Sequence, residues 1–98
     1  MLDDKKILSV CSPKNMVGGP YEVVYKTDYW AIVTLDYEGT PRLGIRWFIG
    51  EIGTPSARGN ATWFVLPEEL YDSILMGLPL KPVQRAKICA YLINQTNE

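Results

Sequence analysis

The sequence predicts an α+β fold, in which an antiparallel sheet of four to five strands comes first and two C-terminal helices follow. Between residues 21 and 66, apolar and polar residues alternate in short runs that are separated by turns rich in Gly and Pro. After residue 66, apolar residues instead recur at the three- to four-residue spacing of a helix. Strands followed by helices are typical of an α+β domain, and 98 residues suffice for one domain over 1–98.

The alternating runs define the expected strands. We expect a short first strand at 7–11, a Gly- and Pro-rich loop at 12–20, and further strands at 21–25, 29–37, 42–49 and 61–66. Residues 1–6 are charged and are expected to fray. The segment 38–41, Glu-Gly-Thr-Pro, predicts a tight hairpin turn. The loop 50–60 is long for a hairpin connection, which indicates that it is either mobile or functional.

Two prolines mark the starts of the expected helices. Pro67 suits a first helical position, and Glu68 and Glu69 suit the positive end of the helix dipole. Gly77 is expected to end this first helix. A second helix is expected over 82–95, with Pro82 at its start.

Composition excludes several classes of function. The chain has no histidine, so a Ser-His-Asp or Cys-His nucleophile cannot be assembled from it. Its two cysteines, Cys11 and Cys89, lie far apart in sequence and form no metal-binding or redox pair, so we expect reduced thiols, no metal and no cofactor. No apolar run is long enough to cross a bilayer, and the start MLDDKK lacks a signal peptide. We therefore expect a cytoplasmic protein that is not an enzyme.

One candidate binding site follows from the strand pattern. Arg46 and Phe48 share a face of the 42–49 strand, and Arg42 begins that strand. If Trp30 on the neighbouring strand lies beside them, the surface combines guanidinium groups with flat rings. Cations follow phosphates and rings stack on unpaired bases, so this surface suits single-stranded nucleic acid. The structural alternative is that the rings belong to the core and Arg46 pairs with Asp36 across the hairpin.

The segment Ile45-Arg46-Trp47-Phe48 resembles a strand of the positive-cofactor transcriptional coactivators, whose bacterial relatives bind single-stranded DNA. The resemblance covers about residues 29–77, including the later Pro67-Glu68-Glu69 helix start. It implies a curved antiparallel sheet packed on a helix, dimerisation through that helix and a groove for single strands. It also implies that Arg46 and Phe48 contact nucleic acid, with Arg58 as a further basic contact.

Two functions from different classes remain open. The first is single-stranded DNA or RNA binding by a homodimer, with Arg46, Phe48, Arg42, Arg58 and Trp30 as binding residues and the cations of 81–87 as an added positive patch. The alternative is a homodimeric protein-interaction or small-ligand module, because the chain has more apolar residues than one thin domain readily buries.

Overall fold

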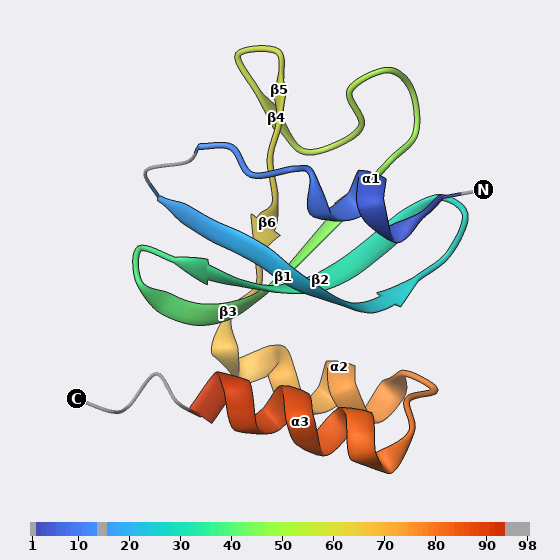
Figure 1. The fold of residues 1–98 in the computed structure, drawn as a ribbon, viewed down its shortest axis with the longest axis vertical. Coiled ribbons are helices and arrows are strands. Elements are labelled where there is room, and N and C mark those ends of the chain that lie inside the picture. The colour runs from blue at the N-terminus through green and yellow to red at the C-terminus, as the bar shows by residue number, and fades with distance from the viewer. Residues whose placement is uncertain (1, 14–15, 94–98) are drawn as a thin grey trace.

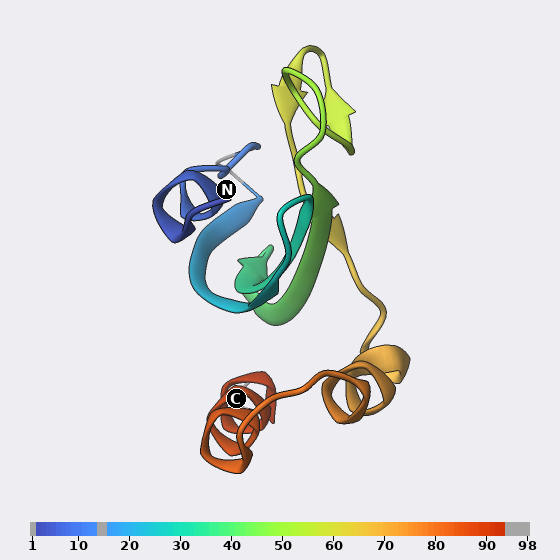
Figure 2. The same ribbon diagram turned by 90° about the vertical axis from the view of Figure 1, so that its right-hand side faces the viewer.

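The computed structural model describes residues 2–13 and 16–93. Its centre is a four-stranded antiparallel sheet in the order β1-β2-β3-β6, which confirms the α+β fold class (Figure 1). The strands of this sheet are β1 (Val17–Lys26), β2 (Trp30–Tyr37), β3 (Thr40–Trp47) and β6 (Phe64–Val65). In the side view the sheet curls strongly, with the N-terminal helix on its inner side and the C-terminal helices outside it (Figure 2).

The β2–β3 hairpin is the best-predicted element. Its register runs without a break from Trp30 opposite Trp47 to Tyr37 opposite Thr40. The turn is formed by Glu38 at φ 53° and Gly39 at φ 85°. Two successive positive φ angles are typical of the turn whose twist matches paired strands. The hairpin is therefore confirmed, although its turn is shorter than the four residues expected, because Thr40 and Pro41 already belong to β3.

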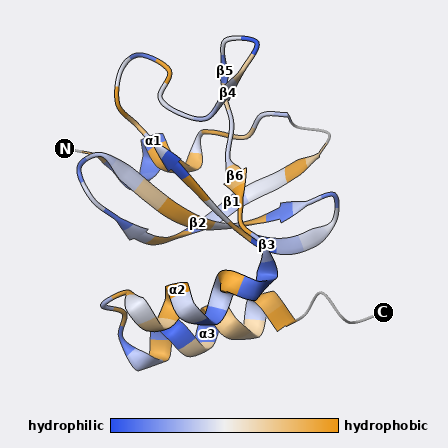
Figure 3. Cartoon of the chain, turned by 180° about the vertical axis from the view of Figure 1, so that it is seen from behind, coloured by the Kyte–Doolittle hydropathy of each residue, from blue (hydrophilic) through white to orange (hydrophobic). Residues whose placement is uncertain are grey.

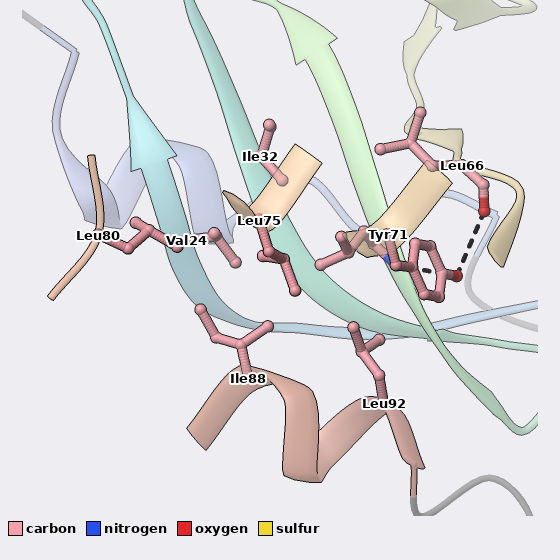
Figure 4. Close-up of a cluster of buried hydrophobic side chains, with 9 residues drawn as sticks. Val24, Ile32, Leu66, Tyr71, Leu75, Leu80, Ile88 and Leu92 are labelled. Carbon is pink, nitrogen blue, oxygen red and sulfur yellow. Dashed lines mark hydrogen bonds between the residues drawn. The ribbon is translucent and has the colours of Figure 1, made fainter. Parts of the chain in front are cut away.

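Each face of the sheet carries a separate hydrophobic core. On one face, Ile32 and Leu43 pack against the C-terminal helices through Tyr71, Leu75 and Ile88 (Figure 4). On the other face, residues of β2 pack with the N-terminal helix and the segment before β6. The members of this second core are Leu2, Ile7, Val17, Ala31, Val33, Leu35 and Trp63. Both faces of the sheet are thus largely covered, which explains the nearly continuous burial of residues 31–35.

The C-terminal helices lie side by side below the sheet (Figure 1). A 3₁₀ turn, η1 (Glu68–Leu70), leads into α2 (Tyr71–Gly77), and α3 (Pro82–Ile93) follows. Arg85 of α3 joins the two helices, because its guanidinium donates hydrogen bonds to the carbonyls of Leu75, Leu78 and Leu80. Two C-terminal helices are therefore confirmed, but the first α-helix begins at Tyr71 rather than Pro67, because Pro67 is the extended residue that caps η1. Residues 94–95 of the second predicted helix lie outside the described residues.

The N-terminal prediction was wrong. Residues 7–11 form no strand; instead α1 spans Asp4–Leu8, and Asp3 caps it by accepting a hydrogen bond from the Lys6 amide. The charged start is a capped helix rather than a frayed end, with Ile7 fully buried. The expected loop 12–20 was also too long, since β1 begins at Val17. A register shift between Gly18 and Glu22 lets the strand accommodate Gly-Gly-Pro. Residues 14–15 of that loop lie outside the described residues.

The segment between β3 and the helices is more elaborate than the sequence indicated. The long loop contains a two-stranded hairpin of its own, β4 (Ser56–Ala57) with β5 (Asn60–Ala61). The expected strand 61–66 divides between β5 and β6, and only Phe64 and Val65 join the main sheet. Figure 1 shows this hairpin projecting away from the sheet on the side opposite α2 and α3.

Candidate interaction surface

Arg46 lies inside the protein rather than on a binding face. The residue is 1% exposed, and Nη1 donates hydrogen bonds to the Pro55 carbonyl at 3.1 Å and the Thr62 carbonyl at 2.5 Å. Nη2 donates to the Ile52 carbonyl. Burial lowers the pKa of the guanidinium below its usual value. The predicted ion pair with Asp36 is wrong, since Asp36 accepts from Tyr21 and Tyr91 instead. Arg46 thus anchors the 50–62 segment, with its hydrogen-bond donors directed at that segment's backbone.

Gly53 shows how tightly that segment closes on Arg46. A Cβ at Gly53 would collide with Nη2 of Arg46 and with the Trp47 carbonyl. Its φ of +80° also belongs to the left-handed region that favours glycine. In addition, Thr54 pairs with Trp47 through two backbone hydrogen bonds of 2.7 and 3.1 Å. The long loop is therefore folded back against the end of β3.

Phe48 contacts Arg46, and its ring packs between the Arg46 guanidinium and the Trp63 ring. The Arg46 guanidinium carbon lies 4.8 Å from the Phe48 ring centroid, and the Trp63 ring meets Phe48 edge-on at 6.1 Å. Trp63 is itself fixed by a 2.8 Å hydrogen bond from Nε1 to the Val10 carbonyl. This contact is consistent with the prediction that Arg46 and Phe48 lie on the same face of the chain. The cation–π pair is, however, part of the packing inside the protein.

Trp30 does not lie beside these two residues. In the register, Trp30 is opposite Trp47, whereas Arg46 is opposite Ala31. Residues opposite each other share a face and successive residues alternate, so Trp30 points to the other side of the sheet from Arg46. There it forms a row with Tyr25 at 5.7 Å and Trp47 at 6.5 Å between ring centroids. The predicted surface combining Trp30 with Arg46 and Phe48 is therefore wrong.

The two remaining predicted contacts lie apart from that row. Arg42 is half-buried and its Nη1 lies 3.6 Å from a carboxylate oxygen of Glu68. Arg58 is exposed at the turn between β4 and β5, with a φ of 54°. The five predicted binding residues are thus distributed over both sheet faces and the distal hairpin, and only Arg46 and Phe48 are in contact.

A different surface is open to solvent at the end of the sheet. We call it the aromatic groove; it is a hollow of about 260 Å³ lined by Ile45, Arg46, Trp47, Thr54, Pro55 and Phe64. Its two aromatic residues are exposed, Trp47 at 48% and Phe64 at 57%. Phe64 lies directly across from Ile45 in the β3–β6 pair, which places the rings on one face around an apolar floor. Among the lining residues only Arg46 is charged, and its terminal nitrogens are directed at backbone carbonyls.

Sequence reasoning missed Trp47 and Phe64 as functional candidates. The alternation correctly placed Trp47 on the same side as Leu43 and Ile45, a pattern that is typical of core. Ile45 packs against the core on this face whereas Trp47 is 48% exposed, and the ribbon views show the far end of β3 curling away from α2 and α3 (Figures 1 and 2). Alternation carries no signal for where a sheet curls away from its helices, so the sequence pattern could not have identified this surface.

Several of the described cations have partners within the protein. Lys26 pairs with Asp4 at 2.8 Å and Lys87 lies 4.0 Å from Glu22, while Arg85 binds helix carbonyls. The expected positive patch at 81–87 therefore has two of its three cations engaged. Coloured by hydropathy, the chain shows hydrophilic and hydrophobic residues interspersed along α2 and α3 (Figure 3).

Two other kinds of site are absent from the described part of the chain. Over residues 2–13 and 16–93, no group of three or more His, Cys, Asp or Glu residues is placed to hold a metal ion. Over the same residues, no helix has the length and apolar character to cross a membrane.

Comparison with models of known families, with curated proteins and with solved structures yields no match to this chain.

Proposed function

We propose that the protein is a non-catalytic interaction module that associates with a second copy of itself through the aromatic groove. The observation that carries the proposal is the pair of exposed rings, Trp47 and Phe64, on either side of an apolar hollow. Exposed aromatic rings around a hollow are the features that most often dominate binding energy at protein interfaces.

The groove contains both a protruding ring and a cavity, which makes it self-complementary. The Phe64 ring of one copy fits against the Ile45 floor of the other, and a two-fold axis repeats that contact. Burying the two rings of both copies removes on the order of 400 Å² of apolar surface in total, worth roughly 10 kcal/mol at about 25 cal/mol per Å² before association costs. The net charge of −1 adds little repulsion between two copies. After association costs of at least about 4 kcal/mol, roughly 6 kcal/mol or less remains, so a weak dimer with a Kd of about tens of micromolar or higher is expected.

Sedimentation velocity across a concentration series tests the proposal. The wild-type chain is expected to shift from monomer to dimer, and Trp47→Ala and Phe64→Ala to remain monomeric at about tenfold higher concentration. Tyr29→Ala is the matched control, because Tyr29 is an exposed aromatic residue outside the groove. A wild-type chain that stays monomeric at millimolar concentration, or a Tyr29→Ala effect as large as that of Trp47→Ala, contradicts the proposal.

Single-stranded nucleic acid binding is the second candidate, and the row Tyr25-Trp30-Trp47 favours it. Successive rings can stack on successive unpaired bases, at roughly 1–3 kcal/mol per base. We place it second because phosphates need cations beside the rings, and Arg46 and Lys87 have partners within the protein. Anisotropy of a labelled oligonucleotide at low and physiological salt tests it, with duplex as control. Salt-sensitive binding that Trp47→Ala abolishes supports it, and no binding at low salt excludes it.

A further inference from the structure

A second cavity lies on the side of the sheet that carries α1. It has a volume of about 260 Å³ and is enclosed between the end of α1, the start of the long loop and β5. Its polar lining residues are Lys6, Ser9, Arg46, Glu51 and Asn60. This cavity shares Arg46 with the aromatic groove, but its other lining residues are different, and neither Trp47 nor Phe64 lines it.

The wall of this cavity contains a buried positive charge with no negative partner. Every acceptor that Arg46 binds is a neutral carbonyl, at Ile52, Pro55 and Thr62. Its Nε is shielded from water and has no hydrogen-bond partner, and no ion pair involves Arg46 among the described residues. A buried guanidinium without a counter-charge destabilises the folded state, and an N–H without an acceptor adds to that cost.

The rest of the lining supplies donors and a second positive charge. The ammonium of Lys6 is exposed and forms no ion pair within the described part of the chain. Asn60 contributes an amide, whereas the Ser9 hydroxyl already donates to the Lys6 carbonyl. Glu51 is the single acidic lining residue, so the formal charge of the lining is positive by one.

We propose that this cavity binds a small oxyanion, namely a phosphate or carboxylate group. Arg46 and Lys6 supply the charge that attracts the anion, and the Arg46 Nε–H is the donor that still lacks an acceptor. That N–H is shielded from water in this structure, and an anion in the cavity places its negative charge against the wall that contains Arg46. The ligand then neutralises a charge that the fold leaves uncompensated.

The test follows the Arg46 Nε–H resonance by nitrogen–proton NMR during titration with sodium phosphate and, separately, sodium acetate. Sodium chloride at matched ionic strength is the reference. The resonance is expected to shift saturably with the oxyanions and not with chloride. A shift with both oxyanions identifies general oxyanion recognition, and a shift with phosphate alone assigns a phosphoryl ligand. No saturable shift with either oxyanion overturns the proposal.

Two variants that leave Arg46 in place make the test specific. Lys6→Gln is expected to weaken the affinity about fivefold, because it removes one exposed charge from the lining. Glu51→Gln is expected to strengthen it by a similar factor. Lys5→Gln is the matched control, since Lys5 belongs to α1 but does not line the cavity. Equal affinities in the Lys6, Lys5 and wild-type proteins overturn the assignment of the site.

Discussion

Replacing Arg46 by methionine removes the donor group that holds the 50–62 segment. Three backbone carbonyls, those of Ile52, Pro55 and Thr62, lose their partner together. A hydrogen bond to a charged donor contributes about 1.5–3 kcal/mol, which gives a gross loss of roughly 4–9 kcal/mol. Removing the buried charge returns several kcal/mol of desolvation cost, because this guanidinium has no negative partner among the described residues. The expected net loss of unfolding free energy is therefore about 2–4 kcal/mol.

Urea unfolding monitored by tryptophan fluorescence measures this loss. The midpoint is expected to fall while the slope with denaturant stays constant, because the surface exposed on unfolding hardly changes. Arg46→Lys is expected to lose nearly as much, since one ammonium cannot span three carbonyls as a planar guanidinium does. Arg58→Met, at the exposed β4–β5 turn, is the control and is expected to change stability by less than about 0.5 kcal/mol. An Arg46→Met loss as small as that of the control refutes the anchoring role.

Three further predictions concern the packing around this anchor and the sheet. Gly53→Ala is expected to cost about 2–3 kcal/mol in the same urea assay, because a methyl group there meets Arg46 and the backbone has a positive φ. Trp63→Phe is expected to cost about 1–3 kcal/mol, since the Val10 carbonyl loses its indole donor. For Tyr91, burial and the hydrogen bond to Asp36 raise the pKa above its usual value of 10.0, so the neutral phenol is favoured in the folded state. The stabilisation of the folded state by the neutral Tyr91 phenol is complete below about pH 10 and is lost as the pH rises further, because the unfolded chain then releases the phenol proton first. The free energy of unfolding measured between pH 9 and 11 should therefore fall less steeply in Tyr91→Phe than in wild type. An equal slope in the two proteins contradicts it.

The parts of the fold that sequence could predict are those governed by local pattern. The hairpin from Trp30 to Trp47 consists of two runs rich in β-branched and aromatic residues around Glu38-Gly39, and the second helix starts at Pro82 as expected, whereas Pro67 precedes a 3₁₀ turn. The N-terminal helix was missed because its signal is a cap, Asp3 with the Lys6 amide, placed before a stretch whose apolar residues also fit a short strand. Periodicity alone cannot separate these two structures over five residues.

The candidate site depended on information that the local pattern does not contain. Alternation correctly separated Arg46 from Trp47, but it could not tell which face each helix covers. Arginines are seldom buried, so the residue type favoured a surface position for Arg46. Its partners in the structure are the backbone carbonyls of residues 52, 55 and 62, and the sequence cannot indicate them because every residue has a carbonyl. The open groove at Trp47 and Phe64 arises from long-range geometry, namely the curl that carries the end of β3 away from α2 and α3.

The contact between two copies across the aromatic groove can be observed directly by isotope-filtered NMR. A sample mixed from labelled and unlabelled protein at a concentration favouring association reports only proton contacts between different copies. We expect contacts from the Phe64 ring of one copy to the Ile45 methyl groups and the Trp47 ring of the other. Intermolecular contacts at any other surface, or none in a sample shown to be associated, would contradict the claim that this groove is the interface.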